Sequence, residues 1–232
     1  MASSSLFFRR GVFRLAAATC VLFIALTVLA MWFYPGGTAM DPTTHGYSFW
    51  PNFFSDLGMT RTPSGAANLT SMVLLVAALS LVGMGPAVFF VALQQFFVRS
   101  RSGRSLSGLA ALSGIVAGGC FIGVALTPWN LYLAAHNAFV MGAFRAFLLA
   151  VVLDGAAILR ERELPKSFAF VFVAFAVLLA GYVLLLTTGP APNSHEGLRV
   201  QVLGQKLIVY ASVVSVLVQA LIADRLQQKM RS

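Results

Sequence analysis

The polar side chains that could do chemistry in this sequence are few, and many of them fall in or near one stretch, residues 34–68. Within it, Asn52, Ser55 and Asp56 lie at positions i, i+3 and i+4 and so share one face of a helix. An amide, a hydroxyl and a carboxylate on one face can hold a polar ligand by hydrogen bonds. The other face of this segment is aromatic and aliphatic: Phe49, Trp50, Phe53, Phe54 and Leu57.

This pattern predicts a short amphipathic helix from Ser48 to Gly58, with its aromatic face in a membrane interface. Ser48 is a favourable N-cap, Pro51 is tolerated in a first turn, and Gly58 is a natural stop. An alternative is a structural lid whose polar face is only hydrated.

The rest of the chain supplies the helices that must position this stretch. Of the 232 residues, 59% are hydrophobic and only 10% are charged, with a mean hydropathy of +0.85. A soluble domain of this composition would have too little polar surface, so we expect one membrane domain over residues 1–232. Its fold class is an all-α polytopic membrane helix bundle. Six spans are predicted at about residues 12–33, 68–98, 106–127, 131–159, 168–188 and 200–222.

The net charge of +9 reflects topology and excludes a nucleic-acid partner. Twelve of the 16 Lys and Arg residues fall at one set of predicted helix ends: Arg9, Arg10, Arg14, Arg99, Arg101, Arg104, Arg160, Arg162, Lys166, Arg225, Lys229 and Arg231. The positive-inside rule therefore places both termini in the cytoplasm and residues 34–68 on the outer side of the cell membrane.

Small residues predict close packing of the third helix. Gly114 and Gly118, and then Gly119 and Gly123, recur at four-residue spacing. Glycines on one face let two helix backbones approach closely in a bilayer. We therefore expect this helix at the centre of the bundle.

The fourth helix carries the clearest intramembrane charge, Arg145, together with His136 and Asn137. Arg145 lies nine residues after His136, which is half a turn out of phase, and Asn137 is closer to the Arg145 face. An ionisable group near mid-membrane costs about 2.5 kcal/mol or more and needs a partner. Two interpretations stay open for Arg145: a ligand-binding group, or an internal strut.

The sixth helix carries Gln205, Ser212 and Gln219 at seven-residue steps, which predicts a polar seam facing the bundle. Lys206 lies one turn inside the outer end of this helix. Its ammonium either snorkels to the interface or pairs with Glu196 or Asp56.

All three histidines of the chain, His45, His136 and His195, are predicted on the outer side. Three imidazoles with one open position would form a catalytic zinc site. No two of them share a helix face, so folding alone would have to bring them together. Outside this alternative, the sequence predicts no cofactor.

Several motifs resemble a family of bacterial and archaeal six-helix membrane proteins that is classified as a domain of unknown function, the nine-nine-eight family. They are Tyr34-Pro35-Gly36-Gly37, Gly46, the run Asn52 to Gly58 (NFFSDLG), Asn68, Thr127-Pro128 and His136. The resemblance implies a six-helix fold and no established activity. A more distant likeness is to DRAM-type membrane proteins, some of which are tied to lipid handling. The chain is also similar to the seven-helix ceramidase and progestin-receptor hydrolases, but it lacks their H-x-x-x-H pair and a seventh helix.

These observations favour an outward-facing polar pocket that binds or translocates a lipid headgroup or a small polar molecule. Its partner would be membrane lipid. The predicted ligand-binding residues are Asn52, Ser55, Asp56, His136, Asn137, Arg145, Gln205 and Lys206. Two alternatives stay open: a metal-dependent membrane hydrolase using His45, His136 and His195, and a structural subunit that docks another membrane protein through residues 34–68.

Overall fold

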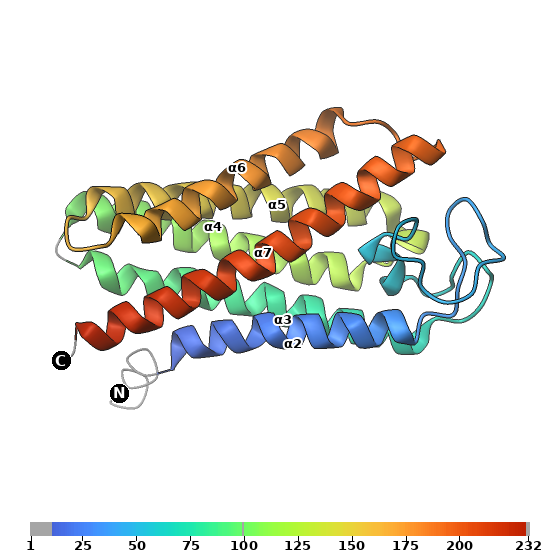
Figure 1. The fold of residues 1–232 in the computed structure, drawn as a ribbon, viewed down its shortest axis with the longest axis horizontal. Coiled ribbons are helices and arrows are strands. Elements are labelled where there is room, and N and C mark those ends of the chain that lie inside the picture. Colours follow the sequence, from blue (N-terminus) through green and yellow to red (C-terminus); the bar gives the residue numbers. More distant parts are fainter. Residues whose placement is uncertain (1–10, 99, 231–232) are drawn as a thin grey trace.

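The computed structural model describes residues 11–98 and 100–230, and its regular structure is entirely helical (Figure 1). In these residues, six helices are long and apolar enough to cross a membrane. They are α2 (Val12–Trp32), α3 (Leu69–Leu93, extended by the 3-10 helix η2, Gln94–Phe97), α4 (Arg101–Leu126), α5 (Trp129–Arg160), α6 (Lys166–Thr188) and α7 (His195–Lys229).

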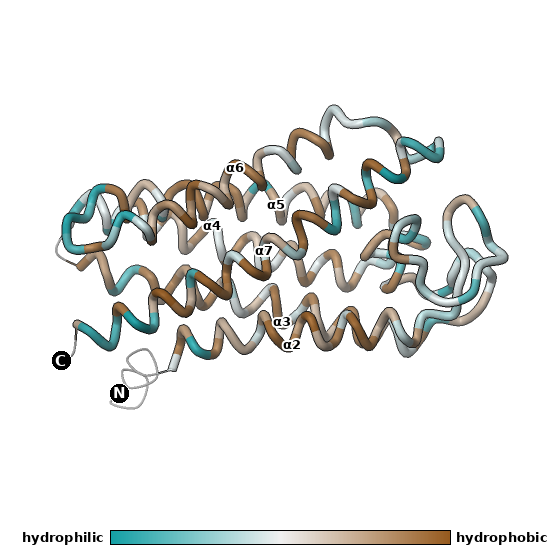
Figure 2. The backbone as a smooth tube through the Cα atoms, viewed as in Figure 1, coloured by the Kyte–Doolittle hydropathy of each residue, from teal (hydrophilic) through white to brown (hydrophobic). Residues whose placement is uncertain are grey.

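The helices form a ring in which each packs on its neighbour in sequence, and α7 closes the ring by lying against both α6 and α2. The start of α2 and the end of α7 lie at the same end of the bundle (Figure 1). Residues 34–68 cover the opposite end, and we call them the cap. Hydrophobic residues fill the middle of the helices, while hydrophilic residues gather at the two ends (Figure 2).

α4 and α7 start earlier than predicted, and a serine caps each of these starts. The Gly103 amide donates to the Ser100 hydroxyl at the start of α4, and the Gly197 amide donates to the Ser194 hydroxyl at the start of α7. As a result, His195, which was predicted in a loop, begins a helix. Four of the basic residues assigned above to one end, Arg9, Arg10, Arg99 and Arg231, lie outside the described residues.

The predicted helix from Ser48 to Gly58 is only partly formed. Its second half is a five-residue 3-10 helix, η1 (Phe54–Gly58), and its first half is a turn closed by the bond from the Asn52 amide to the Ser48 carbonyl. The carboxylate of Asp56 accepts the amide of Phe53 and so starts η1 at that point. Local side-chain bonds to the backbone compete here with a continuous helix.

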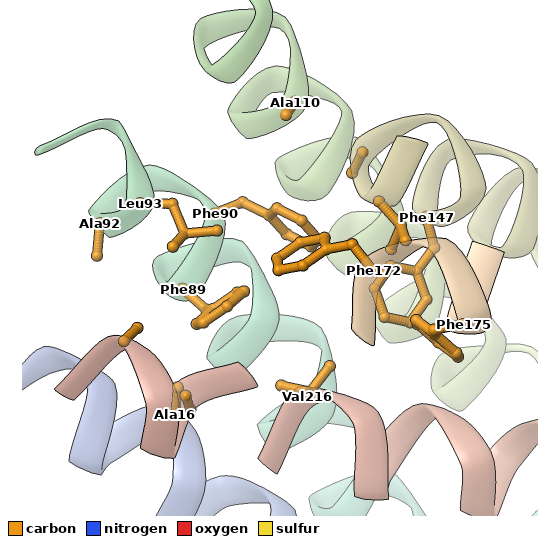
Figure 3. Packing of buried hydrophobic residues seen from close by; sticks show 14 of the residues in the cluster. Ala16, Phe89, Phe90, Ala92, Leu93, Ala110, Phe147, Phe172, Phe175 and Val216 are labelled. Carbon is orange, nitrogen blue, oxygen red and sulfur yellow. The ribbon is translucent and has the colours of Figure 1, made fainter. Parts of the chain in front are cut away.

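Edge-to-face aromatic pairs connect four of the helices. Phe13 of α2 packs on Phe89 of α3 at 5.9 Å, and Phe90 of α3 packs on Phe147 of α5 at 6.0 Å. Phe147 in turn packs on Phe175 of α6 at 5.3 Å (Figure 3). Lipid would be as apolar as these rings, so packing geometry selects this arrangement more than burial from water does.

The glycines of α4 divide into packed and open positions. The backbones of Gly83 in α3 and Gly118 in α4 approach so closely that a Cβ on Gly118 would lie 2.2 Å from the Gly83 carbonyl oxygen. Gly114 packs against Phe90, and Gly123 packs against Phe139. A Cβ on Gly119 would meet no atom within 4 Å.

Gly118→Ala is expected to lower the free energy of unfolding by about 1–3 kcal/mol, because α3 and α4 must move apart. Its neighbour provides a matched control, since Gly119→Ala gains helix propensity of up to about 1 kcal/mol without a clash. Thermal unfolding in detergent measures both. Equal midpoints for the two variants would contradict the predicted α3–α4 contact.

Candidate functional site

The cap is folded on itself before it meets the helices. Each of its ends is folded back on itself, the first by the bridge between Gly36 and His45 and the second by the bond from the Asn68 amide to the Thr60 carbonyl. Gly37 has a φ of +89°, and a Cβ there would lie 2.4 Å from the Ser64 nitrogen, so only glycine fits. The Asn68 side chain donates to the carbonyls of Leu57 (3.0 Å) and Met59 (2.9 Å). The cap is therefore an ordered structure.

Asp56 is the buried charge at the centre of the cap. Its side chain is 2% exposed and accepts three hydrogen bonds. Oδ2 accepts from Asn52 Nδ2 at 2.9 Å and from the Phe53 amide at 3.0 Å, while Oδ1 accepts from Trp129 Nε1 at 3.1 Å. Burial raises the pKa of Asp56 to about 6, against the opposing effect of these donors and of the Lys206 ammonium.

Asn52 connects this carboxylate to the rest of the cap. Its side chain is fully buried, and its Nδ2 also donates to the Gly37 carbonyl at 3.0 Å. Its Oδ1 accepts the Ser48 amide at 2.9 Å. The backbone carbonyl of Asn52 accepts from the Tyr47 hydroxyl at 3.1 Å and from the Lys206 ammonium. Both side-chain polar atoms of Asn52 are thus used to hold the loop.

Gln205 and Lys206 of α7 bind the cap on the side that faces the helices. Gln205 Oε1 accepts the Phe54 amide at 2.7 Å. Lys206 is 3% exposed, and its ammonium lies 5.4 Å from the Tyr47 ring centre and 4.9 Å from the Phe49 ring centre. The ammonium points into the cap, so the snorkelling interpretation is wrong. It contacts the Asn52 carbonyl directly and acts on the Asp56 carboxylate through space.

Two side chains of the cluster were not identified from the sequence. Trp129, at the start of α5, donates to Asp56, and Tyr47 donates to the Asn52 carbonyl. Asn130, which follows Trp129, forms a second link between α5 and the cap by hydrogen bonds with Thr60. The sequence did contain one indication of these contacts. The short turn at Pro128 places the indole N–H of Trp129 and the side-chain amide of Asn130 at the same end of the bundle as the cap.

The structure separates the predicted site into two sets. Asn52, Asp56, Gln205 and Lys206 converge in the cap. Ser55 of the cap and His136 of α5 line a cavity between the cap and the helices. Asn137 and Arg145 are instead exposed, on the face of α5 that points away from the bundle. Their predicted place in the pocket wall is therefore wrong. His136 is buried at this end of the helix. Arg145 lies nine residues later, half a turn out of phase, and so faces the opposite way.

The structure does not bring the three histidines together. His45 is exposed in the cap, His195 is exposed in the first turn of α7, and His136 is buried under the cap. Among residues 11–98 and 100–230, no group of three His, Cys, Asp or Glu side chains could hold a metal ion. The predicted zinc site of His45, His136 and His195 therefore has no geometric support.

A cavity of about 60 Å³ lies directly beneath the cap, and we call it the cap cavity. Its polar lining consists of Ser55, His136 and Gln205. The Nδ1 of His136 lies 2.8 Å from the Thr127 carbonyl oxygen, so Nδ1 carries the proton and Nε2 is the ring's acceptor. No Asp, Glu, Lys or Arg is among the described residues that line the cavity.

A second cavity of about 40 Å³, the mid-bundle cavity, lies below the first. Five residues line both cavities: Phe23, Leu79, Phe121, Phe144 and Val209. The lower part is almost entirely apolar, and it contains the Ser212 hydroxyl, which is buried without a hydrogen-bond partner among the described residues. The two cavities together form a polar-to-apolar gradient from the cap into the bundle.

Comparison with known proteins gave no match to a family model, a curated protein sequence or a solved structure. The resemblance to the nine-nine-eight family stays a prediction.

The buried carboxyl predicts an unusual dependence of stability on pH. Because its native pKa of about 6 exceeds the unfolded value of 3.8, the native state binds more protons between these values. The free energy of unfolding should therefore fall as pH rises from about 4 through about 6, by on the order of 3 kcal/mol, and then level off. Thermal unfolding of wild type and Asp56→Asn across this range measures it, since the variant lacks this dependence.

Asp41 offers a control of opposite sign. Hydrogen bonds from Thr43 lower the pKa of this exposed carboxyl, so its contribution is present above pH 3.8 and lost in acid. Asp41→Asn should keep the decline between pH 4 and 6. The same decline in Asp56→Asn would contradict the assignment to Asp56.

Proposed function

We propose that the protein is an integral membrane protein that binds a lipid-like amphiphile beneath the cap. The polar group of the ligand would lie near Ser55, His136 and Gln205, and its apolar part would extend into the mid-bundle cavity. The observation that carries this proposal is that a partly polar cavity adjoins an apolar one, since five residues line both. Concave sites with a few placed polar groups in an apolar lining are typical of ligand binding.

The polar lining favours an uncharged group over a zwitterion. The Ser55 hydroxyl can donate and accept, the Gln205 amide can donate, and His136 Nε2 can accept. The charges predicted to select a headgroup lie elsewhere: Asp56 and Lys206 are buried in the cap, and Arg145 is on the outer surface. A hydroxyl, ester or amide of a lipid satisfies these donors and acceptors without bringing an unpaired charge into the bundle.

The size of the cavities indicates how such a ligand would enter. Volumes of about 60 and 40 Å³ hold only a few non-hydrogen atoms. A full acyl chain would need the helices to separate, and the lateral route lies between the helices that line both cavities, where lipid tails would surround the bundle. We therefore infer that the polar group of the ligand binds at the capped end, while its acyl chain enters laterally between the helices.

His136→Phe tests the proposal because it keeps the ring and removes the acceptor. We expect the variant to retain about fivefold less amphiphile than wild type, since one hydrogen bond contributes about 1 kcal/mol. Native mass spectrometry of protein purified in mild detergent, with a monoacylglycerol as the probe, measures the bound fraction.

The exposed face of the same helix provides the control. Asn137→Ala and Arg145→Gln should bind the monoacylglycerol as wild type does. Equal binding by His136→Phe, with an unchanged unfolding midpoint, would overturn the proposal, and so would a loss of binding limited to Arg145→Gln.

We also propose that the cap lies on the outer face of the cell membrane and that both termini are cytoplasmic. The described basic residues of the other end include Arg14, Arg104 and Arg162, as the positive-inside rule requires. Exposed aromatic side chains gather at the capped end, where Trp32 is 83% and Trp50 is 61% exposed. Such rings are typical of the bilayer interface.

Cysteine accessibility tests this orientation. Thr43→Cys in the cap should react with a membrane-impermeant maleimide in intact cells, whereas Arg162→Cys should react only after permeabilisation. Both positions are exposed, so their reactivity depends on the side of the membrane. The reverse pattern would contradict the proposed topology.

A further inference from the structure

Asp154 is a buried acid that the cap and its cavities do not use. Its side chain is fully buried on the inner face of α5, and neither carboxyl oxygen has a hydrogen-bond partner among the described residues. An ionised carboxylate without partners in an apolar interior costs several kcal/mol, which neutralisation avoids. This position therefore favours a carboxyl that holds a proton.

Among the described residues, the neighbouring helices supply a hydroxyl and no counter-charge. The polar side chain that acts on Asp154 is Ser107 of α4, which is also fully buried and unpaired among the described residues. On the α6 side, Phe172 packs next to Gly155. The charges of the adjoining segments are engaged or exposed elsewhere: Arg104 of α4 is exposed, Lys166 of α6 donates to the Leu159 carbonyl, and Asp224 of α7 pairs with Arg14.

A second buried acid lies nearer the end of the bundle that holds Arg14, Arg104 and Arg162, which we call the basic end. Glu161 Oε1 is buried without a partner among the described residues and lies 2.7 Å from the place of a Cβ on Gly103. Gly103 and Ser107 are one turn apart on α4, a rise of about 6 Å. Both acids thus face the same side of α4, with Glu161 nearer the end.

The outer member of this pair reaches a cavity. Glu161 lines a space of about 200 Å³ at the basic end, which we call the end cavity. Other residues lining it, including Glu163, Lys229 and Met230, are exposed, so the end cavity opens at the surface. Water in the end cavity can therefore reach Glu161, which lies beside Gly103, one turn of α4 from Ser107.

We propose that Asp154 is a proton-binding site that exchanges its proton with the end cavity through Glu161. In each exchange, one proton passes from water to the Glu161 carboxylate and onward to Asp154, while one proton leaves by the same route. The Ser107 hydroxyl can accept a hydrogen bond from one carboxyl and donate its own proton onward. A proton needs only one carboxyl, whereas no metal-binding group of three side chains exists among the described residues.

Infrared spectroscopy of the purified protein tests the site directly. Wild type at neutral pH should show the C=O stretch of a protonated carboxyl, and Asp154→Asn should lack it. Asp56→Asn is the control, because that carboxyl lies outside the bundle interior and is ionised above its pKa of about 6. If wild type lacks the band, or if the band persists in Asp154→Asn, Asp154 does not hold the proton.

Transfer into heavy water tests the path. The band should shift as deuterium replaces the proton, and Glu161→Gln should slow this shift by about tenfold or more, because the charge must then cross an apolar stretch. Glu163→Gln, which alters an exposed acid of the same cavity, should leave the rate unchanged. An unchanged rate in Glu161→Gln, or equal slowing in both variants, would overturn the role of Glu161.

Discussion

The rest of the capped end depends on the hydrogen bonding of two buried side chains, Asn52 and Asp56. A carboxylate and an amide removed from water must have their oxygens and N–H groups paired, or each unpaired group costs roughly 1–3 kcal/mol. The loop cannot supply all the partners alone. The indole of Trp129 comes from α5, and the ammonium of Lys206 comes from α7. Pairing these groups therefore fixes the cap to two helices that are distant in sequence.

The same requirement explains why the cavity beneath the cap is uncharged. In the part of the chain that the structure describes, the acid and the cation at the centre of this end, Asp56 and Lys206, are both used to close the cap. What lies below them is a hydroxyl, an amide and an imidazole, followed by aromatic and aliphatic side chains. Binding an uncharged polar group at this position is consistent with a bundle that excludes unpaired charge. The proposed ligand class follows from the use of the charges elsewhere.

The six helices were predictable because long uncharged runs between basic or breaker-rich segments have few alternatives in a bilayer. The position of Arg145 was harder, since its half-turn offset from His136 was visible but which of the two faces inward was not. Asn52 and Asp56 were recognised as a pair, yet an amphipathic helix was inferred where two side chains hold a turn and a 3-10 helix. Periodicity reports which residues share a face and cannot report bonds to Trp129, 73 residues away.

Amide hydrogen exchange across the cap tests most directly whether the buried pair holds it. The amides of Phe53 and Phe54, which donate to Asp56 and Gln205, should exchange as slowly as those of the helices in wild type. Lys206→Met should accelerate both, while Arg199→Met, which removes an exposed cation from the same end of α7, should not. Wild-type exchange at Phe53 and Phe54 at the rate of an unprotected amide would show that the cap is not held by these bonds.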